Sequence, residues 1–262
     1  MSIPFYKYHG AGNDFIILDH YDGIHNEPES ELIRNICHRR FGAGADGLII
    51  LLPSDRNDFR MKFFNSDGFE GSMCGNGGRC IVAFAKKKGL INNQTEFEAI
   101  DGTHLAKISE DSNIMLKMQD VKSIESRADG FFLDTGSPHL VLFSDYSNPD
   151  GFFMEGKKIR NDRQLFPDGC NVNYIRYRNK IDLDITTYER GVEDITYSCG
   201  TVAVASAIAA GVHSGYYHSP VSLYSAGGVL KVHYSHSNGA FHDIWLEGPA
   251  IFVFKGEFDR TA

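Results

Sequence analysis

The sequence lacks the features that mark exported, membrane-spanning or nucleic-acid-binding proteins. Its longest weakly polar run, residues 202–212, is too short to cross a bilayer, and the first ten residues contain no apolar signal-peptide core. The net charge is −8, so no cationic surface for nucleic acid or an anionic membrane is expected. We therefore expect a cytoplasmic protein without nucleic-acid or membrane partners.

The sequence also lacks the cysteine patterns of metal sites and disulfide frameworks. It has 5 cysteines and no CxxC pair, which argues against a zinc site. An odd number of cysteines without an export signal argues against a disulfide scaffold. We therefore expect the thiols to be reduced and no metal to be bound.

What the sequence does contain is an internal repeat of domain size. Its 262 residues, 42% of them hydrophobic, are enough for two domains with cores. A shift of about 125 residues aligns the following pairs: Cys74 with Cys199, Gly75 with Gly200, Phe41 with Phe166, Gly102 with Gly227, Leu105 with Leu230 and, at one residue less, Gly12 with Gly136. A shared offset near half the chain length indicates a duplicated domain. We predict one domain over residues 1–119, to which residues 252–262 return, and a second over 120–251.

The predicted secondary structure agrees between the two halves. In each half, alternating hydrophobic residues predict a strand, at 60–64 and at 183–188, that leads to a Cys-Gly pair. Small-residue helical stretches then follow at 79–88 and at 202–213. The other predicted elements are a helix near 29–38 and strands around 15–18, 48–52, 96–108, 113–118, 140–143, 173–177, 221–233 and 244–246. The pattern favours a mostly β protein with one central helix in each domain.

Cys74 stands directly before the run GNGG, which leads into the first of these helices. The first N–H groups of a helix have no partner within the helix and carry partial positive charge. This setting favours a thiolate, and the same amides can bind a carboxylate that glycine allows to approach closely. The alternative is a buried structural cysteine in a glycine-rich turn.

Cys199 occupies the equivalent place in the second half, where Gly200 and Thr201 would supply the amides. Two structural cysteines at equivalent positions of a repeat explain the pattern less well than a functional pair. Ligand sites favour domain interfaces. There, one thiol would take a proton from a carbon and the other would return a proton to the opposite face. We therefore hypothesise inversion of an amino-acid stereocentre, with the helix amides stabilising the negative charge that forms.

Polar residues before each cysteine are candidates for holding an amino acid. Asn65 and Arg190 each lie nine residues before their cysteine, at equivalent places in the predicted repeat, and Glu189 precedes Arg190. Arg190 is suited to grip a second carboxylate, and Glu189 is suited to bind an ammonium group. The alternative is a solvated surface ion pair.

Taken together, these segments make the chain resemble the diaminopimelate epimerase family along essentially its full length. The segments that carry the resemblance are YHGAGNDFIILD, RRFGAGADGLIIL, FFNSDGFEGSMCGNGGRC, DTGSPHLV, CNVNYI, YERGVEDITYSCGT and AGGVLKV. The resemblance implies an isomerase that interconverts LL- and meso-2,6-diaminoheptanedioate, in lysine and peptidoglycan precursor synthesis, without pyridoxal phosphate or metal. The implied fold is α/β (α+β), with two pseudo-symmetric domains, each a strongly bent, mainly antiparallel β-sheet around a central helix.

The resemblance also implies roles for individual residues. Cys74 and Cys199 would be the acid–base pair. The substrate-binding residues would be Asn13, Asn65, Gly75, Asn76, Asn171, Glu189, Arg190, Gly200 and Thr201. His139 and Glu189 would tune the thiols. Family members can form homodimers, so the implied partners are the small-molecule substrate and a second copy of the chain.

Two positions depart from the family pattern. Gly47 stands where members often carry glutamine, and Ser137 stands where they often carry asparagine. Because both positions line the substrate in the family, the local hydrogen bonds are expected to differ or to pass through water. The departures bear on fine specificity and not on the reaction class.

Three other functions stay open at this stage. A proline or hydroxyproline racemase would use the same two-thiol design, but its substrates lack the distal groups that Glu189 and Arg190 would bind. A phenazine-type isomerase of similar fold is disfavoured because the thiol pair is not expected there. A thiol redox or binding protein would cycle the two cysteines through a disulfide and would not exchange a carbon-bound proton with solvent.

Overall fold

The structure, a computed structural model, describes residues 2–24, 26–127, 129–144 and 149–259. The chain divides into two compact units, Met1–Leu116 together with Gly248–Ala262 (unit 1) and Lys117–Glu247 (unit 2). The boundaries predicted after residues 119 and 251 differ from these limits by a few residues. Within the described residues, no helix has both the length and the apolar character needed to cross a membrane.

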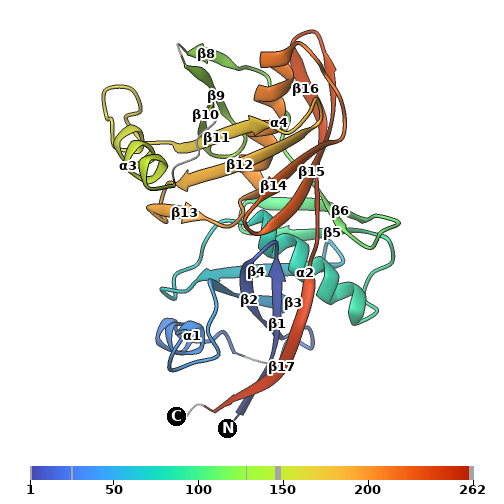
Figure 1. Cartoon of the computed structure of the whole chain (residues 1–262). Helices are drawn as coiled ribbons and strands as arrows, with labels where there is room; N and C mark the ends of the chain where they lie inside the picture. Colours follow the sequence, from blue (N-terminus) through green and yellow to red (C-terminus); the bar gives the residue numbers. More distant parts are fainter. Residues whose placement is uncertain (1, 25, 128, 145–148, 260–262) are drawn as a thin grey trace. The chain divides into compact units, whose positions relative to one another are not determined.

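The strands of unit 1 form a mainly antiparallel sheet (Figure 1). They pair in the order β17-β1-β2-β3-β4-β5-β6-β7. Their bounds are β1 Ser2–Gly10, β2 Asn13–Asp19, β3 Gly47–Leu52, β4 Phe59–Asn65, β5 Gln94–Ala99, β6 Gly102–Ile108, β7 Ile114–Lys117 and β17 Ile251–Asp259. The pairs β2–β3 and β4–β5 are parallel. Each is joined by a helix, α1 (Ser30–Cys37) or α2 (Gly75–Lys87), because parallel neighbours need a crossover connection.

Unit 2 repeats this arrangement. Its strands pair in the order β8-β9-β10-β11-β12-β14-β15-β16, and the short β13 pairs with the end of β12. Their bounds are β8 Glu125–Arg127, β9 Gly130–Asp134, β10 Pro138–Phe143, β11 Asn171–Tyr177, β12 Asp182–Glu189, β13 Asp194–Thr196, β14 Val221–Ser225, β15 Gly228–Ser237 and β16 Ala240–Gly248. The parallel pairs β10–β11 and β12–β14 are again joined by helices, α3 (Pro149–Arg160) and α4 (Gly200–Ser214). The predicted fold class is therefore confirmed.

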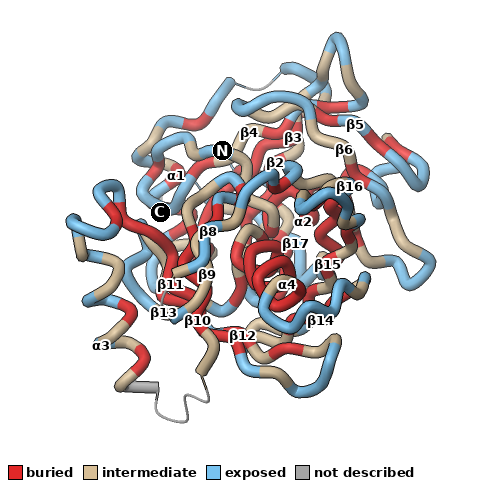
Figure 2. Tube along the Cα trace, turned by 90° about the horizontal axis from the view of Figure 1, so that it is seen from above, coloured by how far each residue is buried: buried red, intermediate tan, exposed pale blue. Residues whose placement is uncertain are grey.

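One helix lies at the centre of each unit. Helix α2 packs against β1, β2, β3 and β4, and α4 packs against β9, β10, β11, β12, β14 and β15. Figure 2 views α4 nearly end-on and shows it mostly buried, and its buried residues extend from Gly200 to Gly211. Its alanine-rich sequence explains this, because small apolar side chains let strands approach a helix from several sides.

The second helix of each unit covers the opposite face of the sheet. Side chains alternate along β11, so Val172 and Tyr174 join the core under α3. Tyr177, on the other face, donates a hydrogen bond to the carbonyl of Ala210 in α4, 3.1 Å away. In unit 1, α1 buries Ile33 and Ile36 in a similar core.

Helix α2 begins earlier than predicted. The sequence predicted a helix over 79–88, but the helix starts at Gly75 and includes the glycine-rich run. A Cβ at Gly77 would lie 3.1 Å from Ile49, and a Cβ at Gly78 would lie 3.1 Å from Leu116 and from Met73. Close packing therefore favours glycine here and offsets its low helix propensity.

The hairpin between β5 and β6 corrects the predicted repeat by one residue. Gly102 begins β6 after a two-residue loop, and Gly228 begins β15 in the same way. Gly102 is therefore equivalent to Gly228 and not to Gly227, and the match of Leu105 with Leu230 is wrong by the same step. The cause lies in the elements between the cysteine and this hairpin, because α4 is two residues longer than α2 (15 against 13) and β14 is one residue shorter than β5 (5 against 6).

A second correction concerns the polar residues before each cysteine. Asn65 is the last residue of β4, and Glu189 is the last residue of β12. Glu189, and not Arg190, is therefore the structural equivalent of Asn65. The loop after the strand is one residue longer in unit 2, which shifted the match made by counting back from the cysteine.

Several elements were absent from the sequence-based assignment. The largest are β1, β9, β17 and α3. In β1 the alternation of apolar and polar residues is broken by Lys7, which is only 7% exposed because it forms an ion pair inside unit 1. A period-2 pattern cannot reveal a strand whose inward-facing residue is a paired charge.

Candidate active site

Cys74 is the N-cap residue of α2. Its backbone is extended (φ −93°, ψ 125°) and its carbonyl accepts the first hydrogen bond of the helix, from Gly78 N at 2.7 Å. The side chain is partly exposed, and its Sγ lies 3.6 Å from Asn13 Oδ1, to which the thiol donates. The thiol therefore lies at the positive end of a buried helix with an amide oxygen as acceptor.

Cys199 is the N-cap residue of α4 and has the same backbone role. Its φ is −138° and its ψ 133°, and its carbonyl accepts a hydrogen bond from Ala203 N at 3.2 Å. Its Sγ lies 3.3 Å from Thr201 Oγ1. The Thr135 hydroxyl donates to the carbonyl of Thr201, 2.9 Å away, and ties this helix start to the turn before β10.

The backbone amides that follow each cysteine are the first N–H groups of a helix. They belong to Gly75 and Asn76 in α2 and to Gly200 and Thr201 in α4. Such groups have no acceptor within the helix and lie at its positive end. Each unit therefore places a thiol beside a backbone arrangement that suits a carboxylate.

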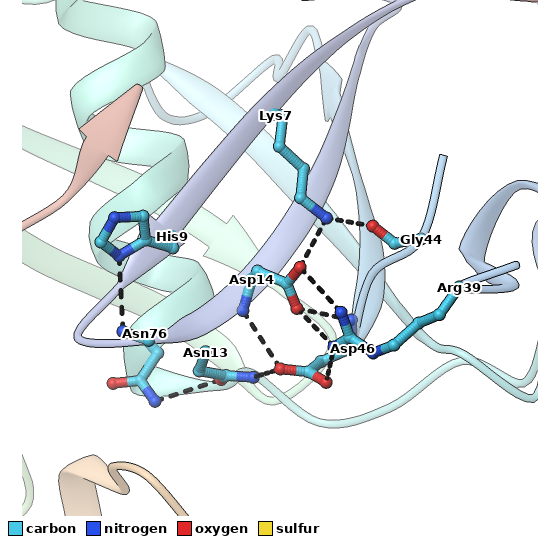
Figure 3. A network of polar contacts seen from close by, with 9 residues as sticks. Lys7, His9, Asn13, Asp14, Arg39, Gly44, Asp46 and Asn76 are labelled. Atoms are coloured by element: carbon cyan, nitrogen blue, oxygen red, sulfur yellow. Dashed lines mark hydrogen bonds and ion pairs between the residues drawn. The ribbon is translucent and has the colours of Figure 1, made fainter. Parts of the chain in front are cut away.

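A tight hairpin presents Asn13 to α2. Ala11 and Gly12 form the two-residue loop between β1 and β2, with φ values of 52° and 85°, as in the left-handed turns that suit hairpins. Asn13 is thus the first residue of β2. Its amide nitrogen donates to Asp46 at 2.7 Å, and its amide oxygen accepts from Asn76 at 3.1 Å (Figure 3).

Behind Asn13 lies a balanced cluster of two acids and two bases (Figure 3). Arg39 bonds to Asp14 at 2.8 Å and to Asp46 at 2.5 Å. Lys7 pairs with Asp14 at 2.6 Å and donates to the carbonyl of Gly44. Burial raises the pKa of Asp14, but the hydrogen bonds from Arg39 and Lys7 outweigh it and hold the pKa at about 2. The Asp14 carboxylate therefore stays charged at neutral pH.

In unit 2, Glu189 ends β12 close to the second thiol. Burial raises the pKa of the Glu189 carboxyl, and the neighbouring Thr196 hydroxyl and Cys199 thiol offset part of the rise. Arg190 follows, with its guanidinium donating to the carbonyl of Asp168 at 3.2 Å. A carboxyl group with a raised pKa beside a thiol is suited to exchanging protons with it.

Asn171 braces the segment that carries Arg190. Its amide oxygen accepts from the Arg190 backbone N–H at 2.9 Å. Its amide nitrogen donates to the Ser137 hydroxyl at 2.6 Å and to the carbonyl of Pro138 at 3.4 Å. Ser137, which stands where family members often carry asparagine, is thus bonded directly to Asn171.

His139 lies on β10, opposite Asn171, and is fully buried. Burial lowers its pKa to about 3; the hydrogen bond with Asn173 opposes this, and the charge of Arg190 adds to it. The Asn173 amide nitrogen, which can only donate, lies 3.2 Å from His139 Nδ1. The low pKa leaves the imidazole neutral at physiological pH.

Gly47 leaves no room for a side chain. A Cβ there would lie 2.6 Å from the Phe63 ring and 2.6 Å from the carbonyl oxygen of Phe64. Gly47 pairs with Asn65 across β3 and β4, so the Phe63 ring fills space beside the end of β4. The polar side chain expected at position 47 in the family is replaced here by an aromatic surface.

Among the described residues, no group of three or more His, Cys, Asp or Glu side chains is placed to hold a metal ion. All five cysteines lie in described segments and none forms a disulfide. Each unit combines a thiol with helix N-terminal amides, beside the Asn13 and Asn76 amides in unit 1 and the Glu189 carboxyl in unit 2. This combination suits proton transfer next to a carboxylate.

Comparison with known proteins identifies the family. The sequence profile of diaminopimelate epimerase matches residues 5–124 and 131–253. The chain belongs to this family. A diaminopimelate epimerase of Flavobacterium psychrophilum is 45% identical over 250 residues, covering 95% of this chain and 98% of that protein. One of Chlorobaculum tepidum is 40% identical and covers 94% and 98%.

Solved structures share the fold at low sequence identity. A phenazine biosynthesis protein of the PhzF family from Bacillus anthracis has a TM-score of 0.74 at 15% identity, covering 98% of this chain and 99% of that one. A hydroxyproline epimerase from Agrobacterium vitis has a TM-score of 0.68 at 14% identity, covering 98% and 92%. These likenesses establish the two-unit fold alone, and the family assignment rests on the sequence matches.

The structure groups the predicted site residues by unit. Asn13, Gly75 and Asn76 surround Cys74, and Asn65 ends the neighbouring β4. In unit 2, Glu189, Gly200 and Thr201 lie at Cys199, while Asn171 and Ser137 support Arg190.

Sequence reasoning assigned no role to Asp46, Arg79 or Asn173. Asp46 and Arg79 lie inside quoted family segments, RRFGAGADGLIIL and CGNGGRC, and these segments were the available signal. Asn173 lies in the quoted segment CNVNYI, and this segment was the available signal that the residue has a role. Asn13 lies 33 residues from Asp46, and His139 lies 34 residues from Asn173, so no local pattern could reveal these two contacts.

Proposed function

We propose that this chain epimerises diaminopimelate between its LL and meso forms, the activity for which its relatives are named, with Cys74 and Cys199 as the acid and base. The observation that carries the proposal is the repeated placement of the thiols. Each cysteine is the N-cap of the buried central helix in its unit, followed by glycine. Two thiols placed alike by a duplicated fold suit a reaction that is the same in both directions.

The proton steps balance without any further reagent. One cysteine, as thiolate, takes the α-proton, so its S–H bond forms as the C–H bond breaks. The other cysteine, as thiol, gives its proton to the opposite face of the carbanion and becomes the thiolate. The protonation states of Cys74 and Cys199 are thereby exchanged, and the reverse reaction starts from the exchanged form.

Helix amides stabilise the carbanion in this proposal. As the C–H bond breaks, negative charge spreads onto the adjacent carboxylate. The N–H groups of Gly75, Asn76, Gly200 and Thr201 would hold that carboxylate at the positive ends of α2 and α4. Loss of one preorganised donor typically costs about 3–4 kcal/mol of barrier. Because these groups supply the stabilisation, the proposed reaction needs neither pyridoxal phosphate nor metal.

The distal end of the substrate requires a second set of contacts. Diaminopimelate carries an ammonium and a carboxylate far from the reacting carbon. We assign the distal carboxylate to Arg190, whose guanidinium forms a planar fork, and the ammonium to Glu189 and Asn65. The bracing of the Arg190 backbone by Asn171 supports this assignment, because it holds the base of a long, flexible side chain.

We further infer a cytoplasmic homodimer. Strand β17 exposes four consecutive apolar residues, from Ile251 at 47% to Phe254 at 44%. Exposed apolar side chains gathered along one strand are typical of a protein–protein interface. The substitution Phe254→Lys is expected to dissociate the dimer in sedimentation equilibrium, whereas Ile24→Lys, at another exposed apolar residue (80%) of unit 1, leaves it intact. Equal masses for both variants and the wild type would contradict this interface.

Proton exchange with solvent tests the proposed reaction directly. The reduced protein is incubated with LL-diaminopimelate in D₂O, and the α-proton is followed by NMR. Incorporation of deuterium together with formation of the meso isomer is the expected result. Exchange with proline but not with diaminopimelate would instead assign the chain to proline chemistry. Absence of exchange with either substrate would refute the proposed function.

A further inference from the structure

A chain of hydrogen bonds joins the charged cluster of unit 1 to the Cys74 thiol. It runs from Asp46 to Asn13 and from Arg79 through Asn76 to the same Asn13 (Figure 3 shows all but Arg79 and the thiol). The two ends of this chain of hydrogen bonds are charged side chains, one of which can only accept and the other only donate. A carboxylate accepts and a guanidinium donates. The orientation of every amide between them therefore follows from chemistry.

Asp46 fixes one side of Asn13. The Asn13 amide nitrogen lies 2.7 Å from Asp46 Oδ2. Because a carboxylate oxygen can only accept, the nitrogen of Asn13 must face Asp46 and its oxygen must face away. Asp46 itself is held by Arg39 at 2.5 Å and by the backbone N–H of Asp14 at 3.1 Å, so the acceptor has little freedom to move.

Arg79 fixes the other side. Its Nη2 donates to Asn76 Oδ1 at 2.7 Å. Because a guanidinium only donates, the oxygen of Asn76 faces Arg79 and its nitrogen faces Asn13 Oδ1, 3.1 Å away. Arg79 is fully buried and also donates to the carbonyls of Gly75 at 3.3 Å and Pro249 at 3.4 Å. The oxygen of Asn13 is thus locked in place from two directions.

The locked oxygen is the group that faces the Cys74 thiol, 3.6 Å from Sγ. An amide oxygen only accepts, so the sulfur must donate and must carry a proton to do so. We propose that Asp46 and Arg79 are positioning residues that lock Asn13 with its oxygen toward Cys74, and that they thereby hold Cys74 as the proton-bearing thiol before substrate binds. Cys74 is then the proton donor of the resting pair, an assignment that rests on the proposed function.

Other charged or titratable groups of unit 1 lie around this chain of hydrogen bonds. They are Asp14, Lys7 and Arg39 behind Asp46, His9 on β1, whose Nδ1 accepts from the Gly12 N–H at 3.4 Å (Figure 3), and Cys80 within α2. The helix N-terminus favours the thiolate, whereas the locked oxygen favours the thiol. Release of the lock should therefore lower the pH at which Cys74 becomes reactive.

The test measures alkylation of each thiol in the substrate-free full-length protein. Iodoacetamide labelling is followed across pH by peptide mass spectrometry, and Cys199 in the same molecules serves as the internal reference. In Asp46→Asn the group opposite Asn13 can donate as well as accept, so one of the two constraints that hold the Asn13 oxygen toward the sulfur is lost. The midpoint for Cys74 is expected to fall by about one pH unit or more, with no change at Cys199.

Two further variants separate the lock from a simple charge effect. Asp14→Asn removes the same charge from the same cluster but leaves the side-chain bond between Asp46 and Asn13 in place. It is expected to move the Cys74 midpoint much less. Asp46→Glu keeps a carboxylate acceptor and is expected to restore a midpoint near that of the wild type.

Equal shifts in Asp14→Asn and Asp46→Asn would overturn the proposal, because they would show a general electrostatic effect. An unchanged Cys74 midpoint in Asp46→Asn would also overturn it. These readouts need no substrate. Failure of the epimerase assay would therefore refute the proposed function and leave the alkylation result standing.

Discussion

The two units place a thiol at the same point of the same fold and surround it differently. Cys74 faces the oxygen of Asn13, an uncharged acceptor. Cys199 faces the hydroxyl of Thr201, which can donate or accept, and lies by the Glu189 carboxyl, whose pKa is raised by burial. The backbone position is shared, but the proton environment of the sulfur is not.

This difference teaches that the duplicated fold fixes where the sulfur lies, and that the neighbouring side chains decide how it holds its proton. The same divergence is seen one strand away. Phe15 pairs with Gly47 in unit 1, and His139 pairs with Asn171 at the same place in unit 2. A pseudo-symmetric scaffold thus places two different sets of side chains around its two cysteines.

Removal of either thiol should have the largest effect, because the proposed reaction needs both. We expect Cys74→Ala and Cys199→Ala each to reduce epimerisation about 10³-fold or more, in line with the loss of a positioned acid or base. The measurement is turnover of LL- and of meso-diaminopimelate. Cys170→Ala, at a cysteine buried in the core under α3, is the matched control and should keep most activity. Near-normal turnover in either active-site variant would rule out a two-thiol mechanism.

We expect His139, in unit 2, to make the free energy of unfolding sensitive to acid. Its folded-state pKa is about 3, against about 6.5 when unfolded. Between these values the unfolded chain binds a proton that the folded chain does not, so the free energy of unfolding falls as the pH drops. The expected loss is about 1.4 kcal/mol per pH unit.

In His139→Gln this proton linkage is absent. Urea unfolding between about pH 4 and pH 6.5 should therefore depend less steeply on pH than in the wild type, by about one proton. Parallel curves for the two proteins would mean that His139 is protonated in the folded state or does not titrate in this range.

Glu189→Gln is the counterpart, in unit 2, of the Asp46 variant in unit 1. Loss of negative charge beside Cys199 favours its thiolate, so the alkylation midpoint of Cys199 should fall while that of Cys74 stays unchanged. Epimerisation is expected to fall about tenfold, less than when a thiol is removed. Glu193→Gln, at an exposed acid paired with Arg160, is the control. A shift at Cys74 as well would mean that the two half-sites are electrostatically coupled.

Local sequence patterns predicted the elements whose residues interact with near neighbours in the chain. The alternating strands β4 and β12 and the alanine-rich α4 have strong periodicity, and the predictions there agree with the structure within a few residues. The start of α2 and the strand β1 were wrong or absent. In both cases a tertiary contact, glycine packing or a buried ion pair, outweighs local propensity.

The sequence by itself determined the repeat, the pair of cysteines before glycine at helix starts and the family. All of these are encoded by residues close together in the chain. Only the tertiary structure decided which partners the sulfur atoms have. Asn13, Asp46 and Cys74 are distant in sequence and meet because the β1–β2 hairpin, the loop before β3 and α2 converge. Hydrogen-bond donors and acceptors are matched by position in space, which no spacing along the chain specifies.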